Sequence, residues 1–577
     1  MKWQETYNTW KNHSKLDADI LKDLENIEQD ESQLEDAFYA PLEFGTAGMR
    51  GIIGAGINRM NIYTVRQATE GLALFIEEEQ GEQAKKSGVV IAYDSRHMSK
   101  EFAIESARTL GAHGIKAYVF ESLRPTPELS FAVRHLQAAA GIMITASHNP
   151  PEYNGYKVYG EDGGQLPPKE ADDLTRYVRS VEDMLAIEVA EESEIKESGL
   201  LEIIGENVDK AYLDAMERVT INPDMIDRVA NDLTIVFTPL HGTGKMIGVK
   251  ALKQAGFRNI ELVPEQAEPD PEFSTVKSPN PEDPAAFEKA IELGCKIDAD
   301  ILIATDPDAD RLGMAVRTAK GHYEVLTGNQ IASLMLDYIL RAHRETGTLP
   351  QNSVIIKSIV SSDLPKSIAE KSGVKTIDVL TGFKFIAEKI KQYEQDYSHT
   401  FMYGFEESYG YLVQPFVRDK DAIQALIMSA EMAAYHKERN YSCFDALQDL
   451  YHEYGHYKEK TISIKMDGIQ GAQKINDLME RLRNDSPKSF GGIKIKEIED
   501  FKTGKRINED GIEETIDMPS ADVLKYRLVD SSWIAARPSG TEPKIKFYIA
   551  AFDDSGVAVE EKITAFEKAI QRIVEDN

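Results

Sequence analysis

The chain has 577 residues, 42% of them hydrophobic and 28% charged, and a formal net charge of −31. This length is too great for one hydrophobic core, so three or four domains are expected. Strong acidity disfavours nucleic acids and anionic membranes as partners. The two cysteines, Cys295 and Cys443, are far apart in sequence and match neither a disulfide framework nor a zinc site.

The beginning of the chain is polar and has no apolar core of a signal peptide. No later stretch approaches the roughly 18 apolar residues that span a bilayer. These features predict a cytoplasmic protein.

Residues 1–40, rich in Asp and Glu, are expected to form helices. A unit of strand, polar turn, helix, glycine and strand then occurs three times. Its strands are expected at 89–93 and 115–120, at 233–237 and 260–263, and at 354–356 and 377–380. Short apolar strands that alternate with helices predict parallel βαβ units. Gly111, Gly114, Gly256 and Gly373 are expected to end the intervening helices.

From about Tyr457 the pattern changes. Residues 461–466, 493–496 and 546–550 alternate polar and apolar side chains, which is typical of half-buried strands. Helices are expected at 472–483 and 559–573. The fold class predicted is therefore α/β, with three related α/β domains of mixed, largely parallel sheets and a C-terminal α+β domain.

A serine and a histidine follow one predicted buried strand. The strand at 142–144 ends at Thr145, Ser147, His148 and Asn149, and two prolines then force the chain to turn. A serine at the end of a strand can act as a nucleophile or a phosphate carrier. An ordinary polar turn is the alternative.

Three carboxylates follow another predicted strand, at 301–304. Asp306, Asp308 and Asp310 alternate along an extended loop, so their oxygens can converge on Mg²⁺ or Ca²⁺. An EF-hand does not fit, because Arg311 and Arg317 replace its glycine and glutamate. A solvated acidic turn is the remaining alternative.

Two further loops suit a sugar phosphate. In Arg537-Pro-Ser-Gly-Thr-Glu, a guanidinium, the Ser539 and Thr541 hydroxyls and the backbone at Gly540 could hold a phosphate. Glu406 and Ser408 could grip vicinal hydroxyls. Each could equally be a plain turn, and Lys384 could be a phosphate contact or a surface lysine. Gly242-Thr-Gly-Lys245 is not a Walker A loop, because Met246 replaces its Ser or Thr.

Together these four loops, in their order along the chain, resemble those of the α-D-phosphohexomutase superfamily, and the resemblance extends from about Phe44 onward. The loops are most similar to the phosphoglucomutase branch, which also includes phosphopentomutases. The Gly404-Phe-Glu-Glu-Ser-Tyr-Gly loop lacks the histidine common in mannomutases and glucosamine mutases.

The resemblance implies roles for individual residues. Ser147 would carry the phosphate and, with Asp306, Asp308 and Asp310, bind Mg²⁺. Glu406 and Ser408 would bind the sugar. The non-reacting phosphate would be held by Arg537, Ser539, Gly540 and Thr541. Catalytic groups around the transferring phosphate would be Arg50, His148, Lys157, Arg311 and Lys384, and either His148 or Lys157 would be the general base.

The resemblance also implies an isomerase of carbohydrate metabolism that interconverts glucose 1-phosphate and glucose 6-phosphate through glucose 1,6-bisphosphate. Its partners would be sugar phosphates, and it would be a monomer or small homo-oligomer. The domains expected are residues 1–206, 207–318, 319–455 and 456–577, arranged around a central cleft.

Three alternatives stay open at this point. The enzyme could be a phosphopentomutase, or another phosphohexomutase such as a phosphomannomutase. A catalytically silent sugar-phosphate sensor is the alternative outside enzymes.

Overall fold

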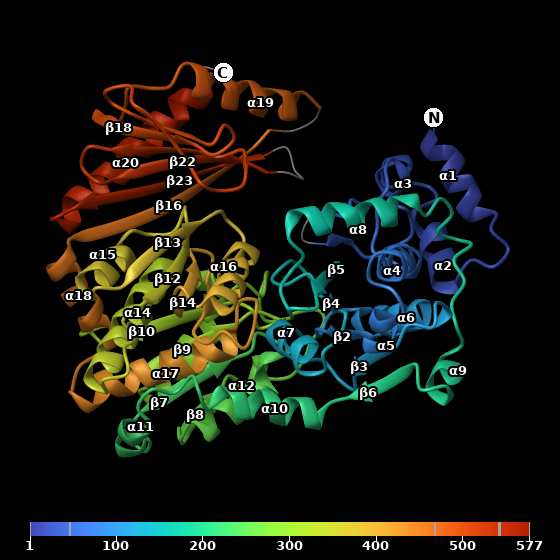
Figure 1. Cartoon of the computed structure of the whole chain (residues 1–577), viewed down its shortest axis with the longest axis horizontal. Helices are drawn as coiled ribbons and strands as arrows, with labels where there is room; N and C mark the ends of the chain where they lie inside the picture. The colour runs from blue at the N-terminus through green and yellow to red at the C-terminus, as the bar shows by residue number, and fades with distance from the viewer. Residues whose placement is uncertain (1, 46–47, 467–468, 540–543, 576–577) are drawn as a thin grey trace. The chain divides into compact units, whose positions relative to one another are not determined.

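The computed structural model describes residues 2–45, 48–466, 469–539 and 544–575 (Figure 1). The chain divides into two compact units. The first comprises residues 1–328, 383–404 and 408–442, and the second comprises residues 329–382, 405–407 and 443–577. In the described residues, no helix has the length and apolar composition that crossing a bilayer requires.

The first unit begins with helices that pack around aromatic side chains. They are α1 (Lys2–Lys11), α2 (Ala18–Ile27) and α3 (Glu31–Phe38). Asp17 and Asp30 cap α2 and α3 by accepting two N–H bonds each, which satisfies donors that a helix start leaves unpaired. Trp10 packs edge-on against Phe38 and Tyr63, which joins this layer to the next helix. The helices predicted for residues 1–40 are confirmed.

A six-stranded mixed sheet follows, in the order β1-β5-β4-β2-β3-β6. Strands β2, β3, β4 and β6 are parallel, whereas β5 is antiparallel to β4 and to β1. The strands are β1 (Met49–Ile52), β2 (Val89–Tyr93), β3 (Ala117–Phe120), β4 (Ala140–Ile144), β5 (Tyr153–Gly160) and β6 (Leu201–Ile204).

Helices cover both faces of this sheet. Val89 and Ile91 of β2 share a core with Leu72 and Phe102, which belong to two of the covering helices. On the other face, Gly141 is glycine because a Cβ would lie 2.7 Å from the side chain of Val133. The helices are α4 (Ile62–Phe75), α5 (Glu82–Ser87), α6 (Ser99–Ala112), α7 (Thr126–His135), α8 (Pro168–Ser180), α9 (Glu192–Glu197) and α10 (Glu206–Met216), and a π-helical turn, η1 (Ile76–Gln80), follows α4.

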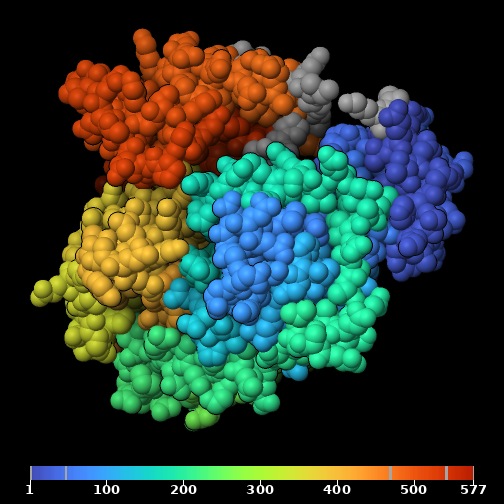
Figure 2. Space-filling model, turned by 45° about the vertical axis from the view of Figure 1, so that its right-hand side comes forward, coloured from blue at the N-terminus to red at the C-terminus, as the bar shows by residue number. Residues whose placement is uncertain are grey.

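The outer helices form a continuous surface. Figure 2 shows the blue surface of α5 and α6 bordered by the teal surface of α8 and α9.

Gly111 lies inside α6 rather than beyond its end, so that part of the prediction is wrong. Its Cβ would lie 2.5 Å from Ile195 of α9, so close packing explains this glycine. Gly114, Gly256 and Gly373 have positive φ angles just after α6, α12 (Gly244–Gln254) and α15 (Leu364–Lys371), as predicted.

The second sheet of this unit has the order β11-β10-β9-β7-β8. Strand β7 is parallel to β8 and β9, and β10 and β11 continue the sheet as antiparallel strands. The strands are β7 (Thr234–Thr238), β8 (Asn259–Leu262), β9 (Ile301–Thr305), β10 (Leu312–Arg317) and β11 (Tyr323–Val325). The surrounding helices are α11 (Pro223–Val229), α12 (Gly244–Gln254), η2 (Pro264–Gln266), η3 (Pro284–Phe287) and α13 (Glu288–Ile297).

Residues 383–404 and 408–442 contribute three more elements and most of a fourth, β14 (Thr400–Glu406), whose last two residues belong to the second unit. The other three are α16 (Phe383–Asp396), β15 (Gly410–Leu412) and α17 (Ala422–Glu438). Helix α17 is buried on almost every side, and Gly248 of α12 lets its Leu426 approach closely.

The second unit contains the third predicted βαβ repeat. Strands β12 (Ser353–Ser358) and β13 (Lys375–Val379) pair in parallel and are connected by α15 (Leu364–Lys371). Helices α14 (Gly328–Glu345) and α18 (Cys443–Tyr454) flank this repeat in the sequence. All three predicted parallel strand pairs are therefore present.

The C-terminal part of the second unit is an antiparallel sheet with helices, as predicted. Its order is β16-β23-β22-β21-β18-β19-β20, with β17 paired to β18. Ile534 and Phe547 of the sheet share a core with Leu478 and Phe566 of the last two helices. The elements are β16 (His456–Lys465), α19 (Ile469–Asn484), β17 (Ser489–Phe490), β18 (Ile493–Asp500), β19 (Lys505–Asn508), β20 (Glu513–Thr515), β21 (Leu524–Leu528), β22 (Trp533–Pro538), β23 (Lys544–Asp553) and α20 (Gly556–Glu575).

Candidate active site

Ser147 follows β4 in a loop with an unusual backbone conformation. Its φ angle is +53°, in the left-handed region that few residues other than glycine adopt. Its N–H donates to Thr145 Oγ1 at 2.8 Å, and its carbonyl accepts from Arg96 at 2.6 Å. A strained backbone persists only where its surroundings impose it, so these bonds fix the direction of the Ser147 side chain.

A buried ion pair after β2 supports this loop. Asp94 lies 3.3 Å from Arg96 and accepts a 2.6 Å hydrogen bond from the Thr145 hydroxyl. Arg96 also donates to the carbonyl oxygens of Asn149 and Pro150. The sequence pattern identified Asp94 and Arg96 only as a turn, because the loop that they support lies more than 50 positions further along the chain.

The three aspartates after β9 converge as predicted. Asp306, Asp308 and Asp310 are all buried, and one carboxylate oxygen of each lies within 4.8 Å of the others. Asp306 Oδ1 accepts the N–H groups of Asp310 and Arg311 at 3.1 and 3.0 Å, which folds the loop back on itself.

The serine and the acidic loop meet directly. The Ser147 hydroxyl donates to Asp306 Oδ2 at 2.6 Å, although the residues are 159 positions apart. His148 Nδ1 lies 3.2 Å from the same hydroxyl. Ser147 is 3% exposed, so the hydroxyl is held in a nearly enclosed position between an imidazole and a carboxylate.

Other side chains hold the remaining carboxylates. Asp308 Oδ2 accepts from Lys157 of β5 and from the Thr126 hydroxyl, both at 2.9 Å. Asp310 Oδ2 lies 3.2 Å from the ammonium group of Lys420. Lys157 is among the catalytic residues that the family resemblance implies, whereas Thr126 and Lys420 belong to none of the four motifs of that resemblance.

The buried charges shift one another's protonation. Burial, reinforced by Asp308 and Asp310, raises the pKa of Asp306 well above its usual range. Burial opposes ionisation of Asp308 as well, but Lys157 holds the pKa of that carboxyl below its ordinary value. Burial, with Arg311 and Arg50 nearby, lowers the pKa of His148 to about 2, so its imidazole is neutral at pH 7.

The triad fits a divalent cation. In the part of the chain that the structure describes, Asp308 Oδ1 and Asp310 Oδ1 are buried and accept no hydrogen bond. Buried oxygens usually have a hydrogen-bond partner or a metal ion, and hard carboxylate oxygens suit ions such as Mg²⁺ or Ca²⁺. The predicted metal site is therefore compatible with the structure.

The remaining predicted catalytic residues of the first unit have different surroundings. Arg311 pairs with Glu282 at 2.6 Å and lies 3.8 Å from Asp310. Arg50 of β1 donates to Asn149 Oδ1 at 2.9 Å, beside the serine loop. Lys384 is half-buried in the first turn of α16, and burial lowers its pKa.

Most residues predicted to bind the sugar and its second phosphate belong to the second unit. Glu406 is buried and accepts the N–H of Gly382 at 2.7 Å. Arg537 is half-buried at the end of β22, opposite Lys546 of β23, and the Ser539 N–H donates to the Lys544 carbonyl. Ser408 belongs to the first unit and is half-buried. The predicted contacts Gly540 and Thr541 lie outside the described residues.

Four family descriptions match the chain in order. "Phosphoglucomutase/phosphomannomutase, alpha/beta/alpha domain I" matches residues 41–184, domain II residues 210–321, domain III residues 327–454, and the C-terminal domain residues 476–565. The chain belongs to the phosphoglucomutase/phosphomannomutase family.

Curated relatives agree along nearly the whole chain. A phosphoglucomutase of Staphylococcus epidermidis is 42% identical over 550 residues, covering 95% of this chain and 97% of the relative. A phosphoglucomutase of Staphylococcus haemolyticus is 40% identical over 530 residues, with 92% and 94% covered.

Solved structures share the fold. A phosphoglucomutase/phosphomannomutase family protein of Burkholderia thailandensis has a TM-score of 0.65 at 19% identity, covering 92% of this chain and 97% of that one. The predicted superfamily and fold class, three α/β domains and an antiparallel C-terminal domain, are thus confirmed. The exact domain boundaries, the residue roles and the cytoplasmic location stay predictions.

Proposed function

We propose that this chain interconverts glucose 1-phosphate and glucose 6-phosphate through a phosphate carried on Ser147. The observation that supports this most is the 2.6 Å hydrogen bond from the Ser147 hydroxyl to Asp306, within a buried triad of carboxylates. Relatives named phosphoglucomutase at 40–42% identity support the choice of substrate.

The transfer exchanges one phosphate ester for another. A free sugar hydroxyl attacks the phosphorus atom on Ser147, the bond to Oγ breaks, and glucose 1,6-bisphosphate forms. The bisphosphate then reorients, and its other phosphate returns to Oγ. Glucose 1,6-bisphosphate is thus both the intermediate and the compound that can prime a free serine.

We assign the metal site to Mg²⁺, which Asp306, Asp308, Asp310 and the Ser147 phosphate would hold. When bound, the ion neutralises charge on the phosphoryl group during transfer. Arg50, Arg311 and Lys384 add positive charge at the same group. In a chain with a net charge of −31, such a local cluster of cations is needed to admit an anionic substrate.

A base must accept the proton of the attacking hydroxyl. His148 lies 3.2 Å from Ser147 Oγ, and Lys157 lies 2.9 Å from Asp308. His148 contacts the carrier serine and Lys157 contacts the triad beside it, so His148→Ala and Lys157→Met should each be compared with the wild type. The substitution that removes the true base should lower kcat by about 10²-fold or more with little change in KM.

Sugar binding follows from the family resemblance. Glu406 and Ser408 would hydrogen-bond the sugar hydroxyls, and Arg537, Ser539, Gly540 and Thr541 would hold the phosphate that does not react. Arg537→Gln should raise KM for glucose 1-phosphate more than it lowers kcat, because this phosphate is bound throughout the reaction.

A panel of sugar 1-phosphates tests the proposal. We expect kcat/KM for glucose 1-phosphate to exceed that for ribose 1-phosphate and mannose 1-phosphate by about tenfold or more, as expected for a site that hydrogen-bonds hydroxyls. A higher value for the pentose would identify a phosphopentomutase instead. Binding without turnover of any of them would indicate a sensor.

A further inference from the structure

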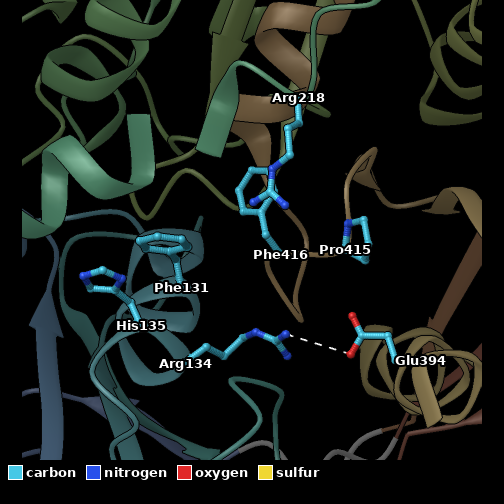
Figure 3. Close-up of a pocket in the computed structure, with 7 residues that line it drawn as sticks. All are labelled: Phe131, Arg134, His135, Arg218, Glu394, Pro415 and Phe416. Atoms are coloured by element: carbon cyan, nitrogen blue, oxygen red, sulfur yellow. Dashed lines mark ion pairs between the residues drawn. The ribbon is translucent and has the colours of Figure 1, made fainter. Parts of the chain in front are cut away.

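A cavity of about 300 Å³ lies in the first unit, at the C-terminal end of α7 (Figure 3). We call it the α7 pocket and define it by Phe131, Arg134, Arg218, Glu394, Pro415 and Phe416. No step of the proposed reaction uses these residues. They come from α7, the end of α10, α16 and the segment before α17.

One wall of the pocket is apolar. Phe131 and Phe416 meet edge to face, with ring centroids 6.1 Å apart, and are 9% and 8% exposed. Pro415 extends this wall, and His135 stacks beside Phe131 at the rim (Figure 3). Such a wall suits the flat, apolar part of a small molecule.

The other wall is positively charged. The Arg218 guanidinium lies over the Phe416 ring, 5.0 Å from its centroid. Among the residues that the structure describes, Arg218 forms no ion pair. In Figure 3 the side chain of Arg134 extends toward Glu394, and that of Arg218 extends over the ring of Phe416.

The one carboxylate of the pocket is already shared. Glu394 forms a close ion pair with Arg418, a residue only 1% exposed, and lies 3.9 Å from Arg134. Burial, followed by the neighbouring Arg418, lowers the pKa of Arg134, while Glu394 and Asp162 oppose this shift. An excess of guanidinium groups is unexpected in so acidic a chain, and guanidinium forks match phosphate oxygens.

We propose that the α7 pocket binds an organic phosphate. Its phosphate group would lie between Arg134 and Arg218, and a planar apolar part would lie against Phe131 and Phe416. A nucleoside monophosphate has both features and a size that suits the cavity.

The walls of the pocket continue to the metal triad. Helix α7 begins at Thr126, whose hydroxyl donates to Asp308, and the segment with Phe416 continues to Lys420, which pairs with Asp310. Because the same segments reach both sites, we infer that occupation of the pocket changes divalent-cation affinity at the triad, and by linkage the cation changes phosphate affinity equally. This second statement rests on the metal site proposed above.

Calorimetric titration of the full chain with adenosine monophosphate tests the pocket. We expect binding in the wild type and in Ser147→Ala, and an affinity at least about tenfold weaker in Arg218→Gln, which loses a charged hydrogen-bonding partner. Arg228→Gln, which removes an exposed arginine paired with Glu438, should bind as the wild type does. Inorganic phosphate should bind more weakly than the nucleotide, because it lacks the apolar part.

Equal affinity in Arg218→Gln, or no binding at millimolar nucleotide, overturns the proposal. If inorganic phosphate binds as tightly as the nucleotide does, the proposal that the ligand is an organic phosphate is overturned. If Arg218→Gln fails to fold, Arg218→Lys is tested instead. Lysine lacks the paired N–H donors of the guanidinium, so this variant should also bind the nucleotide more weakly. Because the titration needs no turnover, a failure of the proposed mutase activity does not affect it.

The linkage has a separate test. Mn²⁺ affinity is measured with and without saturating adenosine monophosphate, in the wild type and in Arg218→Gln, which corrects for metal bound by the nucleotide itself. We expect a change of about threefold or more in the wild type only. Identical Mn²⁺ affinities overturn the linkage, and the first titration still decides the pocket.

Discussion

Thr126 and Asp308 are joined by two hydrogen bonds although they are 182 positions apart in the sequence. The Thr126 N–H donates to the Asp308 carbonyl at 2.9 Å, and the Thr126 hydroxyl donates to Asp308 Oδ2 at 2.9 Å. Thr126 is fully buried. The start of α7 therefore fixes both the backbone and the side chain of the middle aspartate of the triad.

Thr126→Val should weaken the metal site without unfolding the protein. Valine preserves the shape, but Asp308 loses a hydrogen bond to a charged acceptor, typically worth about 1.5–3 kcal/mol. We expect Mn²⁺ affinity to fall about tenfold, and kcat to fall more than KM changes. Thr126→Ser should restore both, whereas a purely structural role would lower only the melting temperature.

Asp308→Asn should abolish tight divalent binding, because it removes a buried oxygen charge and leaves Lys157 without its partner. Turnover should fall by about 10³-fold, as expected when the charge neutralisation at a transferring phosphoryl group is lost. Asp232→Asn, at an exposed position, is the matched control. Unchanged Mn²⁺ binding in Asp308→Asn, measured by calorimetry, would exclude the triad as the metal site.

Gly242→Ala should displace the loop that carries the three aspartates, although Gly242 is not part of that loop. A Cβ at Gly242 would lie 2.3 Å from Pro307 Cα and 2.4 Å from its carbonyl oxygen. Such overpacking costs about 1–3 kcal/mol of the free energy of unfolding, and it should also weaken Mn²⁺ binding. In Gly160→Ala the nearest atom lies 3.4 Å away, so this control should change neither quantity. Denaturant unfolding measures the free energy of unfolding of both variants, and titration with Mn²⁺ measures their metal affinity.

Lys525 should make the stability of the protein depend on alkaline pH. Burial, then Arg527, lowers its pKa from 10.5 to about 7; Asp363 and Asp378 partly oppose this shift, and Lys357 adds to it. Between about pH 7 and 10.5 the unfolded chain binds more protons at this residue, so stability rises with pH, by up to ~1.4 kcal/mol per unit.

Lys525→Met should remove this rise, whereas Lys502→Met, at an exposed position, should preserve it. The measurement is the denaturation midpoint at pH 7, 8 and 9. Parallel pH profiles for the wild type and Lys525→Met would show that the buried ammonium group does not titrate as described.

The sequence predicts features whose determinants are local. Asp306, Asp308 and Asp310 converge because their own loop folds around two N–H bonds to Asp306. The parallel strand pairs follow from apolar runs and glycines within about 30 residues. Local patterns of this kind are the strongest that a single sequence holds.

Features that depend on distant segments were not predictable in the same way. The sequence pattern of β5 does not predict a strand. Its polar residues Asn154 and Lys157 are not exposed, as in a half-buried strand, but are buried against polar partners. Thr126 and Lys420 have no motif of their own, and only the folded chain brings them to the triad. The role of Arg96 likewise requires the loop that it supports.

Intact-protein mass spectrometry with peptide mapping tests the central claim most directly. After incubation with glucose 1,6-bisphosphate, the account predicts an added mass of about 80 Da on Ser147, which excess glucose 6-phosphate removes. Ser147→Ala should fold normally, gain no mass and lose activity by orders of magnitude. Phosphate on another residue, or full activity in Ser147→Ala, would contradict the account.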